Sequence, residues 1–215
     1  TTKNIDFSFL KNKKVLSIGA GPSTEALNDK TLDNYDYLFS CNHFYRNKFL
    51  SNKKIDLVLL GDEVSLLDKE LNSYLEKYQP IVGFEHSSKR KMSEIISFKQ
   101  RYKKCFIYLT RYFSRLGYVP RAMIIAASNN ASLVDCVGVD GFTSQTTHSF
   151  EEGKNPPSFN DAEKFKAQMT VFGDYLLKGI NLSPQSFNNI GEDNKKNIYR
   201  GIFSACKERY CNEES

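Results

Sequence analysis

The stretch VLSIGAGPSTEAL, residues 15–27, is an apolar run that leads into a glycine-rich turn, after which a helix is expected. A strand, a glycine turn and a helix in this order are typical of the first unit of a nucleotide-binding α/β fold. The turn departs from the dinucleotide pattern, because Thr24 stands at its third small position and Pro22 stiffens it. The next apolar run ends in Cys41-Asn42 and lacks the acidic residue that would bind a ribose. NAD is therefore not expected, and no GKS or GKT sequence follows that would indicate a P-loop.

The turn at Gly19–Ser23 has two interpretations. Its glycines would let backbone N–H groups approach an anion, and Pro22 would start a helix whose dipole favours phosphate, with Ser23 as the helix cap. Alternatively, it is a tight strand-to-helix turn that binds nothing.

Short apolar runs separated by helical segments predict buried strands joined by βαβ units, and hence an α/β fold with a largely parallel sheet. The runs are Val15–Ile18, Tyr37–Cys41, Ile55–Leu60, Ile81–Phe84, Phe106–Leu109 and Cys136–Val139. Small residues over Ala122–Ala131 predict a helix packed closely on this sheet. The chain of 215 residues is expected to form a single domain over residues 1–215.

The last third of the chain is expected to contain a loop and two helices. Residues 141–157 are polar and contain two glycines and two prolines, which in a compact domain is typical of a functional or a disordered loop, and this segment is the best candidate for a lid. Apolar residues at helical spacing predict a helix over about 158–178, and a polar helix is expected over about 192–210.

The composition bounds the partners and the compartment. The net charge of +5 suits an anionic ligand and gives no ground to expect nucleic acid. The five cysteines form no CxxC pair, and no apolar run approaches the roughly 20 residues of a membrane span, so we expect a cytoplasmic protein with reduced thiols. The basic runs Lys53-Lys54, Lys89-Arg90-Lys91 and Lys103-Lys104 are solvated faces, or else a peripheral contact with the anionic inner face of a membrane.

Two motifs resemble a known family. Gly19-Ala20-Gly21-Pro22-Ser23 and Cys41-Asn42-His43-Phe44-Tyr45 resemble the paired GNGPS and CNQFY motifs of the bacterial sialyltransferases of glycosyltransferase family 42. The segments KKIDLVLLGD, AMIIAAS, VGVDGF and NLSPQSF resemble that family's later segments in the same order, so the likeness extends from about Val15 to Ile190. It implies a single Rossmann-like domain of the GT-A type with a lid. It also implies transfer of a sugar from a CMP-sugar, CMP-sialic acid foremost, to a glycan acceptor, lipid-linked or free, in bacterial surface glycan assembly such as lipooligosaccharide or capsule.

The resemblance also implies a donor pocket. Asn42 matches a donor-contacting asparagine, while Ala20 replaces an asparagine that contacts the nucleotide. Phe142 or Thr143 stands near the first of the family's tyrosines that assist the leaving phosphate, and the following lid contains no tyrosine. The expected donor-binding residues are Gly19, Ala20, Gly21, Pro22, Ser23, Asn42, His43, Asp140, Phe142 and Thr143.

The catalytic groups are expected among the histidines and arginines. His148, in the lid region, lies broadly where the family has its general base, whereas His86 is expected to face solvent. Arg115 and Arg121 flank the start of the small-residue helix, where a guanidinium would bind the leaving phosphate unless both are surface arginines. Neither a metal nor another cofactor is expected, because the sequence contains no DxD pair and no His/Cys/Asp cluster with ligand spacing.

Two other functions remain open. The GxGPS loop and a late G-x-D also resemble the pterin pyrophosphokinase-like domains, which would bind a triphosphate with Mg²⁺. The missing lid tyrosines are also compatible with a non-catalytic module that binds a nucleotide or a glycan.

Overall fold

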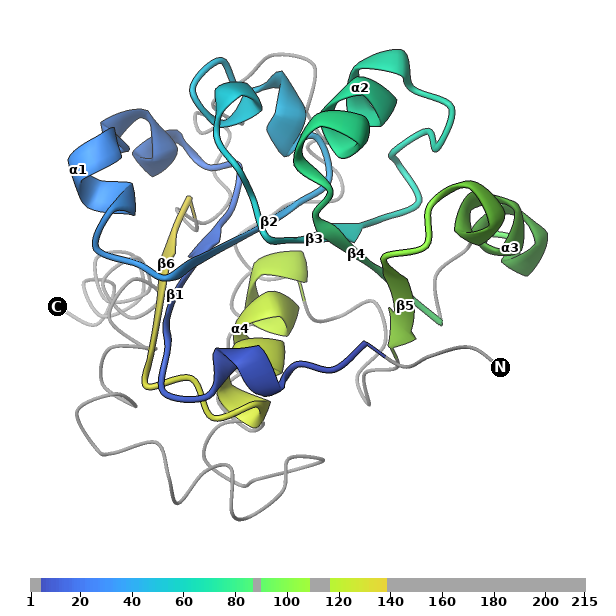
Figure 1. The fold of residues 1–215 in the computed structure, drawn as a ribbon. Helices are drawn as coiled ribbons and strands as arrows, with labels where there is room; N and C mark the ends of the chain where they lie inside the picture. The colour runs from blue at the N-terminus through green and yellow to red at the C-terminus, as the bar shows by residue number, and fades with distance from the viewer. Residues whose placement is uncertain (1–4, 87–89, 109–116, 139–215) are drawn as a thin grey trace, which may run out of the picture.

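The computed structural model describes residues 5–86, 90–108 and 117–138, which form a mixed α/β Rossmann-like unit (Figure 1). Six strands, all parallel, lie in the order β5-β4-β3-β2-β1-β6. They are β1 (Lys14–Ile18), β2 (Tyr37–Cys41), β3 (Leu57–Leu60), β4 (Ile81–Glu85), β5 (Cys105–Tyr108) and β6 (Leu133–Val137). The predicted fold class is confirmed.

The strand bounds follow the apolar runs except in β6. This strand begins at Leu133, three residues before the predicted start at Cys136, and pairs with β1 over its whole length. Asp135 interrupts the apolar pattern there, yet it is buried, and its carboxylate accepts a hydrogen bond of 2.7 Å from the hydroxyl of Tyr35. The apolar pattern therefore does not predict the first three residues of β6, because one of them is an aspartate that is buried with its own hydrogen-bond partner.

Helices cover both faces of the sheet (Figure 1). Helices α1 (Asp29–Leu32), α2 (Lys69–Tyr78) and α3 (Met92–Arg101) pack on one face, together with the short 3-10 turns η3 (Phe44–Arg46) and η4 (Leu50–Asn52). Helix α4 (Tyr118–Ser128) packs on the other. The first five strands progress in one direction across the sheet, and α4 then returns the chain to place β6 beside β1. Right-handed crossovers require this change of face when the direction reverses.

Small side chains bring α4 close to the sheet. Ala122, Ala126 and Ala127 are almost completely buried, and Met123 fills the space between them and the strands. The predicted close-packed helix is confirmed, although it begins at Tyr118 and ends at Ser128. Because α4 runs back from the carboxyl ends of the strands, its first turn lies at the edge of the sheet where ligands bind in open α/β folds.

Three predicted elements lie outside the described residues: the lid over 141–157 and the helices over 158–178 and 192–210. The domain boundaries therefore remain predictions. Within the described ranges, no helix combines the length and the apolar character needed to cross a bilayer.

Candidate functional site

The strand order creates a switch point between β1 and β6. The chain leaves β1 toward β2 on one side, whereas β6 joins β1 from the other side. In open α/β sheets, ligands bind outside the carboxyl ends of the strands at such a point. The turn Gly19–Ser23 follows β1 and Gly138 follows β6, so both lie at this position (Figure 1).

The glycine turn is bonded along its length to the end of β6. The N–H of Gly19 donates to the carbonyl oxygen of Val137 (2.8 Å), and the N–H of Gly21 donates to that of Gly138 (2.9 Å). A Cβ on Gly19 would overlap the carbonyl group of Gly138. The two backbones touch here, and only glycine permits that approach.

Two expectations for this turn change. Pro22 starts a helix, as predicted, but it is the five-residue 3-10 helix η2 (Pro22–Ala26). The cap is Gly21, so the prediction that Ser23 caps the helix is wrong. The Ser23 hydroxyl instead accepts a hydrogen bond of 2.8 Å from the N–H of Gly138. The helix η2 is too short to give a strong dipole, and the N–H groups of Gly19 and Gly21 both donate to the end of β6. Neither the helix dipole nor the glycine amides therefore provide a reason to expect a phosphate at this turn. Ala20 is half-buried between the two glycines.

Asn42 lies at the neighbouring corner, immediately after β2. Its backbone is left-handed (φ 52°), a conformation that asparagine tolerates better than most residues. Its side-chain Oδ1 accepts from the N–H of Gly61 (2.9 Å), and its Nδ2 donates to Oε1 of Glu63 (2.5 Å). The amide of the predicted donor contact is thus held in one orientation by the loop that follows β3.

The remaining residues of the CNHFY motif divide into two groups. Phe44 and Tyr45 are buried: the Phe44 ring packs edge-on against Tyr74 (4.8 Å between centroids), and the Tyr45 hydroxyl donates to Asp68 (3.1 Å). His43 is half-buried next to Asn42. The first half of the motif therefore lies at the sheet edge, and the second half anchors it to the core.

A second loop, residues 61–64, follows β3 at this edge and was not expected from the sequence. Arg90 holds this loop in place. Its guanidinium donates to the carbonyl oxygens of Gly61 and Val64 (both 2.6 Å), and its backbone N–H donates to the carboxylate of Asp62 (3.0 Å). The Arg90 side chain is only 5% exposed, so its interpretation as part of a solvated face is wrong. This clamp spans more than 25 positions of sequence, and no local pattern signals it.

The loop positions an unusual carboxylate. Burial raises the pKa of Glu63, and the adjacent charge of Asp62 raises it further, whereas Arg90 and the Asn42 hydrogen bond act in the opposite direction. The residue as a whole is exposed, while its carboxylate is directed inward against Gly61. Burial, with Glu63 as a second cause, raises the pKa of the neighbouring Cys41 thiol to about 12, so this cysteine is neutral and no nucleophile.

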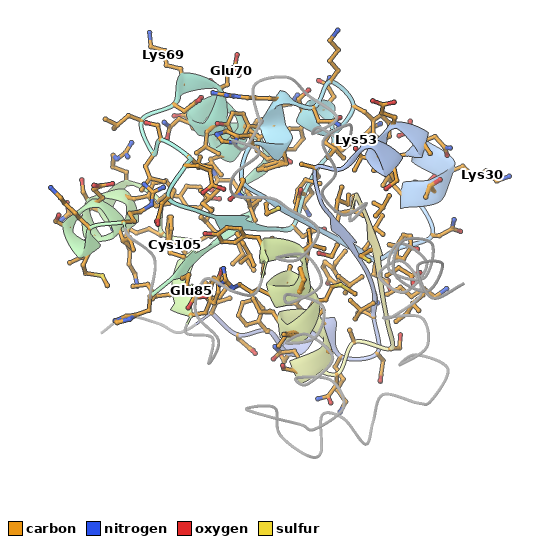
Figure 2. All side chains as sticks on the ribbon, turned by 180° about the vertical axis from the view of Figure 1, so that it is seen from behind. Lys30, Lys53, Lys69, Glu70, Glu85 and Cys105 are labelled. Carbon is orange, nitrogen blue, oxygen red and sulfur yellow. The ribbon has the colours of Figure 1, made fainter. Side chains whose placement is uncertain are left out.

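Arg121 occupies a buried position beneath this edge. Its Nε lies 3.3 Å from Oε2 of Glu85, both side chains are under 5% exposed, and its guanidinium lies 5.1 Å from the centre of the Tyr118 ring. Glu85, labelled in Figure 2, is the last residue of β4, and this ion pair joins it to α4. The interpretation of Arg121 as a solvated surface arginine is therefore wrong, and its proposed role toward a leaving phosphate remains a prediction.

Of the basic runs, Lys53-Lys54 forms ion pairs at the surface. Lys53 pairs with Asp29 (2.5 Å) and Lys54 with Asp56 (3.2 Å). Figure 2 shows Lys30 and Lys69 extending away from the molecule. Contact with a membrane remains a prediction.

Several expected site residues lie outside the described residues: Arg115, Asp140, Phe142, Thr143 and His148. Of the other two histidines, His86 is exposed, as predicted. Within the part of the chain that the structure describes, no three His, Cys, Asp or Glu side chains are placed to hold a metal ion, and Cys41, Cys105 and Cys136 form no disulfide.

The geometry can be compared with known proteins. No family model and no curated protein sequence matches this chain. Among solved structures, it is similar to the sialyltransferase CstII from Campylobacter jejuni, determined in complex with the substrate analogue cytidine-5'-monophosphate. The two are 17% identical and superpose with a TM-score of 0.52, over 84% of this chain and 85% of that chain. The chain has a sialyltransferase-like fold.

The sialyltransferase-like fold agrees with the placement of the two motifs quoted from the sequence. The GAGPS turn ends β1 and the asparagine of CNHFY ends β2, and these strands are neighbours in the sheet. Two motifs about 20 residues apart thus meet at one edge, next to the switch point.

Proposed function

We propose that this chain is an inverting glycosyltransferase that moves a sugar, sialic acid foremost, from a CMP-sugar to a glycan hydroxyl without a metal ion. The observation that carries the proposal is the meeting of the GAGPS turn and Asn42 at adjacent strand ends of a sialyltransferase-like fold. The solved neighbour was determined with CMP, which makes a cytidine nucleotide the first ligand to test.

In this proposal the nucleotide lies across the carboxyl ends of β1 and β2. The phosphate lies over the turn, near Ala20 and the Ser23 hydroxyl, and Asn42 contacts the donor. His43, next to Asn42, lines the same pocket. The observation supporting this placement is that Asn42 is already oriented by hydrogen bonds to Gly61 and Glu63.

The reaction is a single displacement. The acceptor oxygen attacks the anomeric carbon while the bond from that carbon to the phosphate oxygen breaks, and CMP leaves with the bonding electron pair. The proton of the acceptor hydroxyl passes to a base, for which we propose His148. Arg115 and Arg121 are the candidates for stabilising the departing phosphate. A monophosphate leaving group carries less charge than a diphosphate, so side chains suffice to stabilise it.

The acceptor that we propose is a glycan, carried on a lipid in its membrane-associated form. The net charge of +5 is compatible with work at an anionic inner membrane face.

A thermal-shift panel tests the nucleotide class. The chain is heated with CMP, CDP, UDP, NAD, or ATP with Mg²⁺, and the unfolding temperature is compared with that of the free protein. Because a ligand that binds only the folded state stabilises it, CMP is expected to raise the Tm without added metal. If ATP with Mg²⁺ is the only ligand of the panel that raises the Tm, a pyrophosphokinase-like phosphotransferase is indicated instead.

A second assay separates an enzyme from a binding module. The wild-type chain is expected to release CMP from CMP-sialic acid, and His148→Ala is expected to abolish release while CMP binding persists. Full turnover in His148→Ala would remove His148 from the role of base, and binding without any turnover in the wild type would indicate a module.

A further inference from the structure

The carboxyl end of β2 lacks an acidic residue of its own. In Rossmann-like folds, a carboxylate at the end of the second strand accepts hydrogen bonds from the ribose hydroxyls of the bound nucleotide. Here that position is Asn42, whose side chain cannot supply a negative charge. The structure supplies one from the neighbouring strand, because Glu63, in the loop after β3, hydrogen-bonds to the Asn42 amide at 2.5 Å.

The geometry fixes this carboxylate at the β2 end. Asn42 is held from the other side by the N–H of Gly61, so its amide cannot rotate freely. The Glu63 loop is itself clamped by the two hydrogen bonds from the Arg90 guanidinium. Glu63 is exposed as a residue, and although its Oε2 is directed toward Gly61, the hydrogen bond from Asn42 to its Oε1 lies at the exposed sheet edge, where a ligand can reach it. A group held in this way loses little conformational entropy when it binds.

We propose that Glu63, oriented by Asn42, accepts hydrogen bonds from the ribose hydroxyls of the nucleotide and makes the site selective for ribonucleotides over deoxyribonucleotides. The inference rests on the proposed function, since it presumes a nucleotide at this edge. An ionised carboxylate has two oxygens that only accept hydrogen bonds, and a vicinal diol offers two donors. Asn42 uses one of its two N–H groups on Glu63 and keeps the other for the same ligand.

Charge favours the ribose over the other parts of a CMP-sugar. Both the phosphate and the carboxylate of sialic acid are anions, and an ionised Glu63 would repel either of them. The ribose diol is neutral and donates hydrogen bonds.

The test measures the affinities of CMP and 2′-deoxy-CMP for the full 215-residue chain by isothermal titration calorimetry. Because a hydrogen bond to a charged group is at stake, the wild type is expected to bind CMP roughly 10- to 100-fold more tightly than 2′-deoxy-CMP. Glu63→Gln is expected to lose about tenfold in CMP affinity and clearly less in 2′-deoxy-CMP affinity, since the second ligand lacks the 2′-hydroxyl and keeps only the 3′-hydroxyl. Glu76→Gln, the same chemical change on the exposed surface of α2, serves as the matched control and is expected to behave as the wild type.

A second variant, Glu63→Asp, tests the same contact in case Glu63→Gln does not fold. Glu63→Asp keeps the charge but withdraws the carboxylate by one methylene group, and it too is expected to lose the preference for the ribonucleotide. Equal affinities of the wild type for CMP and 2′-deoxy-CMP, or an unchanged ratio in both variants, would overturn the inference and leave the proposed function standing. Failure of the wild type to bind either nucleotide would overturn both.

Discussion

Gly19 and Gly138 touch through their backbones across the carboxyl ends of β1 and β6. A Cβ on Gly19 would overlap the carbonyl group of Gly138, and one on Gly138, which has a left-handed φ of 75°, would overlap the backbone of Gly19. Hydrogen bonds from the N–H groups of Gly19 and Gly21 reinforce the contact. The glycines of this turn therefore shape the edge at which we place the ligand.

A methyl group at Gly19 should separate these strand ends. Gly19→Ala is expected to destabilise the fold by about 1–3 kcal/mol, because the overlap is with backbone that cannot rotate away. CMP affinity should fall with it. Urea unfolding measures the first effect and calorimetry the second.

Ala20→Gly is the control for that variant, since it removes a methyl group from the same turn and should destabilise by no more than about 1 kcal/mol. Wild-type stability in Gly19→Ala would show that the turn does not need the close approach.

Removing one member of the Glu85–Arg121 pair should be strongly destabilising. Arg121→Ala leaves the almost completely buried Glu85 beside no compensating guanidinium, and a loss of about 3–5 kcal/mol is expected. The loss of stability in Glu85→Gln should be partly reversed when Arg121→Met is added, because an uncharged pair needs no counter-ion. A double-mutant cycle in urea measures the coupling, and strictly additive losses would contradict the pairing.

Glu63→Gln should make the free protein more stable at neutral pH. Because burial and Asp62 raise the folded-state pKa of Glu63, the folded state binds its proton more tightly than the unfolded state. Stability from this group is therefore complete below its unfolded pKa and is lost as pH rises through the raised folded pKa. The difference in Tm between Glu63→Gln and the wild type should grow from pH 4 to pH 7. A variant less stable than the wild type at pH 7 would show that Glu63 is mainly structural.

The contribution of Asp68 to stability should depend on pH in the opposite direction from that of Glu63. Burial alone would raise its pKa, but hydrogen bonds from the Leu71 amide and the Arg46 guanidinium outweigh burial and hold the pKa below 3.8. It also caps α2, so Asp68→Ala is expected to destabilise the fold by roughly 1–3 kcal/mol at neutral pH. This contribution is present above the unfolded pKa and is lost as pH falls through the lowered folded pKa.

Asp68 also tests whether the second half of the CNHFY motif is structural. Its partner Tyr45 belongs to that half, which packs in the core and not at the proposed ligand site. Urea unfolding at pH 7 and pH 3 measures the stability loss in Asp68→Ala. CMP affinity should be unchanged at a temperature where the variant is folded, and a loss of affinity there would place Asp68 in the site.

The sequence was sufficient for the sheet and for one half of the site. Apolar runs predict β2 at its observed bounds, because a parallel strand that is covered on both faces is mostly apolar. The GAGPS turn and Asn42 are also recognisable, since both are local motifs.

The other half depends on contacts between distant segments. Glu63 meets Asn42 across 21 positions, and Arg90 reaches Gly61 across 29. Neither contact has a periodicity or a spacing that a single sequence displays. The same holds for Glu85 and Arg121, which come together only because the first turn of α4 lies beside the end of β4.

A crystal structure of this chain with CMP tests the central claim most directly. We predict the phosphate over the Gly19–Ser23 turn and the ribose beside Asn42 and Glu63, at the carboxyl ends of β1 and β2. A nucleotide bound at any other part of the surface, or none at a saturating concentration of CMP, would contradict the account.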